Sequence, residues 1–173
     1  IPSEWHESQG NVLKGIVVQH DGNRHLDSDK VSGDGPLERL TDGVVNAADG
    51  TVVETIGLQD GTLTWELPEA TDLYRLRVNS HWKDGGRDGI SFLSVEYQHK
   101  DSTEWIVLLN SEVCVGVKSK DDPENKSGPD LEAIYERADG GIIASNVKRL
   151  RYVLGPQDND GTGYTEFEAV GAE

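Results

Sequence analysis

The stretch "LYRLRVNSHW" (residues 73–82) decides the fold, because apolar and polar side chains alternate along it. A period of two is typical of a β-strand that lays one face on a hydrophobic core. The segment therefore predicts a strand with an inward apolar face and an outward polar face. The expected inward residues are Tyr74, Leu76 and Val78, and the expected outward residues are Arg75, Arg77 and Asn79.

Other segments carry the same signal, as alternating or short apolar runs bounded by Gly, Asn and Asp. Residues 90–100 also change phase after Phe92, which predicts a β-bulge or a local twist. Trp65 and Trp105 fall within these patterns and are expected in the core. The further predicted strands are 11–20, 61–70, 90–100, 104–113, 146–155 and 164–171.

Residues 131–138 give the opposite local signal. Leu131, Ile134, Tyr135 and Ala138 recur at helical spacing after Pro129. On this pattern alone the segment predicts a short helix.

Composition limits the class of protein and its partners. The chain has 173 residues, which fits one domain, and it has no apolar run long enough for a membrane-spanning helix. Its formal net charge of -16 repels nucleic acids and anionic membrane surfaces, so neutral ligands and cations are the favoured partners. The single cysteine, Cys114, is expected to be a small buried hydrophobe. The chain starts at Ile1 and lacks Met, so we expect a module cut from a longer protein.

The sequence shows no pattern typical of a catalytic site. It lacks a zinc-protease HExxH motif, a nucleophile elbow and a phosphate-binding glycine loop. Carboxylates are so numerous that no pair stands out as a glycosidase dyad. Catalysis on a polysaccharide, as a hydrolase or lyase, is the weakest of the functions that we consider.

An acidic loop, "LTDGVVNAADGT" (40–51), could hold a metal ion. Ca²⁺ takes about six to eight hard oxygen ligands, which carboxylates, amides and main-chain carbonyls of a tight loop supply. Asp42, Asn46, Asp49 and Thr51 are the candidate side chains. The alternative is a set of ordinary Asp-Gly turns.

Several motifs occur in an order that resembles a known family. They are "LTDG", "WKDGGRDG" followed by a strand with "VEYQ", then "VKRLRYVLG" and a terminal "GYTEFEAVG". Over residues 10–171 the chain resembles the discoidin-like, or coagulation factor 5/8 type C, domains of the galactose-binding-domain-like superfamily. It is most similar to versions found as modules of large bacterial extracellular proteins.

The resemblance implies an all-β fold, a discoidin-like jelly-roll β-sandwich of about eight antiparallel strands, in which residues 131–138 form a strand. It also implies a structural Ca²⁺ ion held by the Leu40 carbonyl, Asp42 and Glu166. Thr51 lies further from Asp42 than the family pattern places its threonine. Asn46, Asp49 and Thr51 therefore depart from that pattern as ligands.

The segment "SHWKDGGRDG" (80–89) would then join two strands at one end of the sandwich. An indole can stack on a sugar ring, and Arg and Asp can bind its hydroxyl groups. His81, Trp82, Arg87 and Asp88 are the candidate carbohydrate ligands, joined by Tyr164. The alternative is a structural bend in which Arg87 pairs with a carboxylate and Trp82 caps the core.

The expected function is that of a single module, residues 1–173, which binds glycan without catalysis. It would tether a secreted or cell-surface bacterial protein to its glycan, with calcium as a structural cofactor and other domains of the parent protein as neighbours. The alternative is a structural or adhesive β-sandwich that contacts another domain or protein and binds no sugar.

Overall fold

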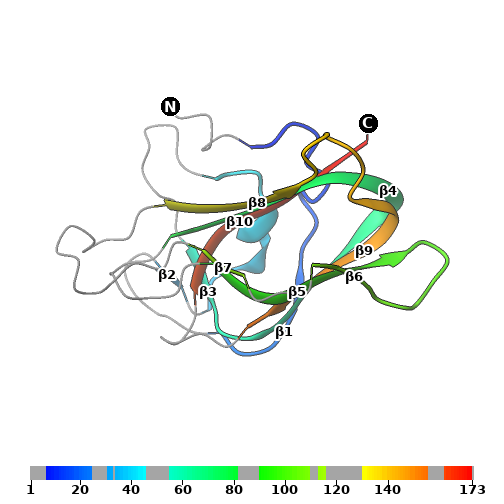
Figure 1. The fold of residues 1–173 in the computed structure, drawn as a ribbon. Helices are drawn as coiled ribbons and strands as arrows, with labels where there is room; N and C mark the ends of the chain where they lie inside the picture. The colour runs from blue at the N-terminus through cyan, green and yellow to red at the C-terminus, as the bar shows by residue number, and fades with distance from the viewer. Residues whose placement is uncertain are drawn as a thin grey trace.

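The chain is almost entirely β-structure. The computed structural model describes residues 7–24, 31–32, 34–45, 55–81, 90–109, 113–115, 130–155 and 162–172 (Figure 1). No helix in these ranges has the length and apolar character needed to cross a membrane. The elements are β1 (Gln19–Asp21), β2 (Val31–Ser32), the 3₁₀ helix η2 (Leu37–Thr41), β3 (Thr55–Leu58), β4 (Gly61–His81), β5 (Ile90–His99), β6 (Ile106–Leu109), β7 (Val113–Val115), β8 (Asp130–Glu136), β9 (Ala144–Leu154) and β10 (Thr162–Gly171).

The long strand β4 belongs to both layers of the sandwich (Figure 1). Its first half pairs with β1 and β9, and β9 continues through β5 to β6 and β7. Its second half pairs with β8 and β10, and β10 continues to β3 and β2. The strand pairs are antiparallel except β2 with β3. This arrangement confirms the predicted jelly-roll sandwich, but the two strands predicted from residue 61 onward are joined in the single strand β4, Gly61–His81.

Aromatic side chains fill the space between the layers. Phe167 of β10 lies 5.2 Å from Trp65 and 5.1 Å from Tyr152, measured between ring centroids. Phe92 meets the edge of Tyr152 at 5.2 Å. The predicted core position of Trp65 is confirmed by its complete burial.

Two further predictions are confirmed, the bulge in residues 90–100 and the strand that the resemblance implies at 131–138. The opening strand predicted for residues 11–20 is wrong for most of its length. The pairing of β5 with β9 shifts register between Phe92 and Ser94, where the change of phase predicts a bulge. Residues 130–136 form strand β8, so the helical spacing there is misleading. The opening strand predicted for 11–20 is mostly absent, because residues 11–15 form turns and a bridge and only Gln19 onward is strand.

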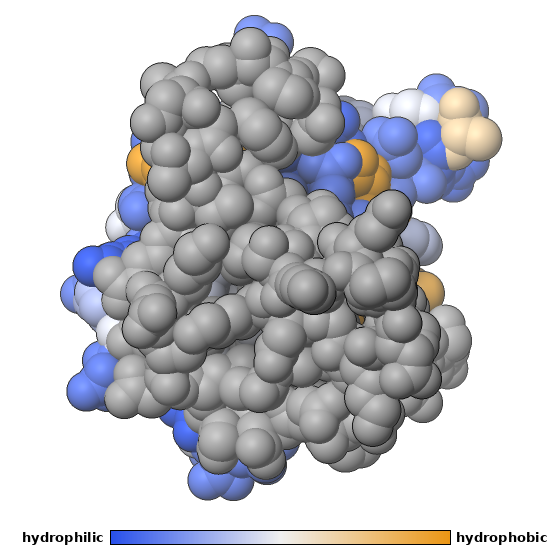
Figure 2. Space-filling model, turned by 90° about the vertical axis from the view of Figure 1, so that its left-hand side faces the viewer, coloured by the Kyte–Doolittle hydropathy of each residue, from blue (hydrophilic) through white to orange (hydrophobic). Residues whose placement is uncertain are grey.

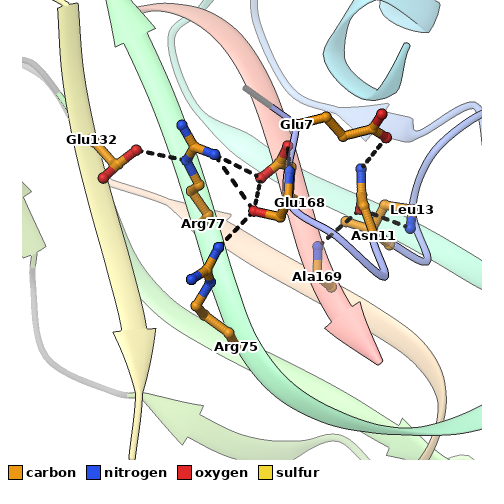
Figure 3. Close-up of polar contacts among 9 residues, drawn as sticks. Glu7, Asn11, Leu13, Arg75, Arg77, Glu132, Glu168 and Ala169 are labelled. Carbon is orange, nitrogen blue, oxygen red and sulfur yellow. Dashed lines mark hydrogen bonds and ion pairs between the residues drawn. The ribbon is translucent and has the colours of Figure 1, made fainter. Parts of the chain in front are cut away.

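The outer face of β4 is buried, contrary to the expectation that Arg77 and Asn79 point outward to solvent. Their exposed fractions are only 3% and 5%. The segment that carries Ser8 covers Arg77: the Ser8 hydroxyl accepts from Arg77 at 3.5 Å, and its main-chain N–H donates to Glu168 of β10 at 3.0 Å (Figure 3). Arg77 also pairs with this carboxylate, with 3.3 Å between Nη1 and Oε2.

Neighbouring contacts complete this buried polar cluster. Arg75 donates to the Ser8 hydroxyl at 2.7 Å, and Arg77 Nε lies 2.6 Å from Glu132 of β8 (Figure 3). Further along, Asn11 Oδ1 accepts from the main chain of Leu13 at 3.1 Å and of Ala169 at 3.2 Å. The N-terminal segment is therefore attached to β10 by side-chain as well as main-chain hydrogen bonds.

Candidate functional site

Two acidic residues that lie far apart in the sequence meet at the rim of the sandwich. Asp42 follows η2 directly as its C-cap, and Glu166 lies in β10, fully buried. Burial raises the pKa of the Glu166 carboxyl to about 10, and the negative charge of neighbouring Asp42 adds to the rise. A side-chain hydrogen bond with Asp42 raises this pKa further, whereas the main-chain N–H of Gly43 lowers it. A cation placed beside both carboxyl groups would favour the ionised form of Glu166.

The surroundings of this pair are tightly built. Gly43 has a φ of 85°, and a Cβ atom there would lie 2.9 Å from both Glu7 Oε1 and Lys14 Cε. Lys14 Nζ pairs with Glu7 at 2.9 Å, and this contact is the main reason why the pKa of Lys14 is raised. The charges of Glu166 and Asp42 raise the pKa of Lys14 further. The acidic groups of Glu7, Asp42 and Glu166 therefore gather around Gly43, which leaves space because it has no Cβ atom.

The structure brings together part of the predicted calcium site. Leu40 lies in η2, two positions before Asp42, with its side chain fully buried. Asn46, Asp49 and Thr51 lie outside the described residues. In the ranges that the structure describes, no group of three or more His, Cys, Asp and Glu side chains is arranged to hold a metal ion. The carboxylate pair would therefore depend on main-chain carbonyls, such as that of Leu40, for further ligands.

The predicted carbohydrate ligands are only partly described. His81 is the last residue of β4, where its backbone pairs with Asp130 at the start of β8. Trp82, Arg87 and Asp88 lie outside the described residues. Figure 2 views the molecule from the left-hand side of Figure 1, and most of the described residues visible around that face are hydrophilic.

Tyr164 corrects one prediction. Its side chain is fully buried, and its ring lies 5.1 Å from that of Phe167. The pairing of β10 with β4 shifts register between Tyr164 and Glu166, so these residues do not follow simple alternation. Tyr164 therefore belongs to the core and is not placed to contact a ligand in solvent.

A second aromatic group lies on the outer face of the other layer. Trp105 is half-buried rather than in the core, which corrects its predicted position. The guanidinium carbon of Arg151 lies 3.9 Å from the centre of a Trp105 ring, as in a cation–π contact. Glu96 accepts from Arg151 Nε at 2.9 Å and holds it there. In the sequence, Arg149 and Arg151 alternate with the buried Leu150 of β9. This alternation places both arginines on the outward face of the strand.

Comparisons with known proteins agree on the fold. No family model and no curated protein matches the sequence. An allantoicase structure matches with a TM-score of 0.55 at 18% identity, over 94% of this chain, which spans only 43% of that enzyme's chain. An F5/8 type C domain from Bacteroides fragilis matches with a TM-score of 0.51 at 17% identity, over 97% of both chains. The CpGH89CBM32-4 protein of Clostridium perfringens matches at 0.50 and 13% identity, over 92% of this chain and 98% of the other.

These identities establish similarity of fold. Two of the matches cover nearly the whole of both chains, and one of them bears the name F5/8 type C. The fold that the motifs imply is thereby confirmed: this chain has the same fold as that F5/8 type C domain and the CpGH89CBM32-4 protein.

Proposed function

We propose that the chain is a non-catalytic carbohydrate-binding module that tethers a secreted protein to glycan and carries a structural calcium ion. The observation that supports it best is the end-to-end match with a CBM32 protein and an F5/8 type C domain. The allantoicase match is with an enzyme of which this chain spans less than half, so it favours a shared fold rather than a shared reaction.

The glycan site is proposed at the end of the sandwich where β4 ends and β5 begins, with His81, Trp82, Arg87 and Asp88 as ligands. A neutral sugar suits a chain with a net charge of -16, because it brings no negative charge of its own. Each site would bind weakly, since a polar sugar exchanges water contacts for similar contacts with the protein. Several copies of the module in one parent protein would strengthen attachment.

The calcium-loaded chain is expected to bind at least one sugar on a glycan array, and Trp82→Ala is expected to reduce that binding by about tenfold or more. An aromatic platform supplies most of the contact area for a sugar face. The matched control is Trp105→Ala, which removes an indole from the outer sheet face, where Arg151 already covers one side. Affinity for the best sugar, measured by calorimetry, distinguishes the two variants.

Three results would count against this proposal. Absence of binding to every sugar would favour the structural or adhesive alternative. Loss of sugar binding in Trp105→Ala but not in Trp82→Ala would show that the sugar binds on the outer sheet face, beside Trp105. Release of reducing ends from a polysaccharide by the chain would show a catalytic role.

The calcium ion is proposed between η2 and β10. Asp42, Glu166 and the Leu40 carbonyl would hold it, and Asn46, Asp49 and Thr51 remain predicted ligands. The donors fit a hard cation, because two carboxyl groups, the buried one of Glu166 and that of Asp42, lie within hydrogen-bonding distance of each other. The ion would supply positive charge that keeps Glu166 ionised and would fasten η2 to the last strand.

The calcium-free protein is expected to lose stability as the pH rises from about 5 to 9. The Glu166 pKa is about 10 in the folded chain against 4.5 for an ordinary glutamate. The folded state therefore holds a proton that the unfolded state releases in this interval, and each step up in pH favours unfolding. Melting temperatures measured in chelator across this range test the expectation.

Glu166→Gln is the informative variant, because it removes the titration and keeps the shape. Its melting temperature should fall less with pH than that of the wild type, and saturating calcium should flatten the wild-type curve. Glu38→Gln, an exposed position of η2, should keep the wild-type slope. Equal slopes for wild type and Glu166→Gln would contradict the assignment.

A further inference from the structure

One lysine is held beside the carboxyl pair at the rim. Lys14 stands between Leu13, which is fully buried, and Gly15, whose main-chain N–H donates to the Thr41 carbonyl at 2.7 Å. Thr41 directly precedes Asp42 in the chain. The main chain on both sides of Lys14 is therefore fixed, and Gly15 ties it to the segment that carries Asp42.

The Lys14 side chain lies over Gly43, the residue that follows Asp42. A Cβ atom at Gly43 would lie 2.9 Å from both Lys14 Cε and Glu7 Oε1. The ammonium of Lys14 pairs with the other carboxylate oxygen of Glu7, Oε2, at 2.9 Å. The charges of Glu166 and Asp42 act on this ammonium as well. A positive charge is therefore within electrostatic reach of the groups proposed to hold calcium.

Glu7 is the more firmly placed partner of this pair. Asn11 donates from Nδ2 to Glu7 Oε1 at 3.4 Å (Figure 3), and the adjacent Ser8 is attached to β10 through its hydrogen bond to Glu168. The Glu7 side chain is 26% exposed, against 56% for Lys14. Glu7 therefore offers a fixed negative charge that offsets the charge of the ammonium it binds.

We propose that Lys14 and Glu7 together set how tightly the rim binds calcium, a role that rests on the calcium site of the proposed function. The ammonium opposes the ion, and the Glu7 carboxylate cancels much of that opposition. The charge around a calcium site is one of the features that tune its dissociation constant. Within the described ranges, no third acidic side chain joins Asp42 and Glu166 in an arrangement that could hold a metal ion, so Glu7 acts through space rather than as a ligand.

Calorimetric titration with calcium chloride at low salt tests this role. Lys14→Gln should bind calcium about threefold more tightly than the wild type, and Glu7→Gln about threefold more weakly. This is the size expected for exposed charges that water screens. A pair that served only to hold the N-terminal segment in place would change both variants in the same direction. Both differences should shrink at high salt, because exposed charges are then screened further.

The matched controls are Arg137→Gln and Asp139→Asn. These residues form an exposed ion pair at 2.8 Å between β8 and β9, so each variant removes the same charge as its counterpart at the rim. Both should bind calcium as the wild type does. Equal changes at the two pairs, or no tightening in Lys14→Gln, would overturn the role of Lys14 and leave the calcium site standing. A wild type that binds no calcium would overturn the site itself and this role with it.

Discussion

Replacing Glu168 with alanine is expected to lower the free energy of unfolding by about 3–5 kcal/mol, as is usual when one partner of a buried ion pair is removed. The carboxylate is fully buried and accepts from Ser8 while it pairs with Arg77. Its removal takes away an acidic partner that lies 3.3 Å from the buried guanidinium of Arg77, a residue that is 3% exposed. The segment that carries Ser8 also loses one of its attachments to β10, the hydrogen bond from the Ser8 main chain. Urea unfolding of the wild type and the variant measures the change.

Glu66→Ala is the matched control. Glu66 pairs with Arg149 at 2.7 Å, but more than half of its side chain is exposed. Solvent screens such a pair, so its removal should cost about 1 kcal/mol or less. Similar losses for Glu168→Ala and Glu66→Ala would contradict the view that the buried cluster fastens the N-terminal segment to the sandwich.

Removal of calcium should lower the melting temperature by roughly 5–10 °C. A ligand present at a hundred times its dissociation constant stabilises the folded state by about 2.7 kcal/mol. For a domain of this size each kcal/mol corresponds to about 2–4 °C. Thermal melts in calcium and in excess chelator give the difference directly.

Glu166→Gln should abolish this difference, because an amide replaces the carboxylate that would bind the ion. Glu38→Gln, which removes an exposed carboxylate from η2, should preserve it. Magnesium should replace calcium poorly, since it demands a smaller and more regular cage of oxygens. Melting curves that do not change with chelator would argue against a calcium ion at the rim.

Local alternation predicted the core strands well because one face of each strand meets the other layer. Trp65, Leu76 and Val78 are all buried as the pattern indicates. The same reasoning failed at Arg77, whose outer face is covered by a segment far away in the sequence. Helical spacing at 131–138 was overridden because β8 pairs along its whole length with β4. An alternating pattern indicates which face of a strand packs on the core. It cannot show that a distant segment of the chain buries the other face as well.

The candidate site was less predictable from the residues themselves. The meeting of Asp42 with Glu166 followed from the resemblance to discoidin-like domains, since no short motif links them. Tyr164 was misplaced because a register shift in β10 separates its face from that of Glu166.

A crystal structure of the chain grown with calcium tests the account of the rim most directly. We predict an ion between η2 and β10, with oxygens of Asp42 and Glu166 at about 2.3–2.6 Å and main-chain carbonyls completing the shell. A rim without an ion, in which Glu166 stays protonated or pairs with the Lys14 ammonium, would contradict it.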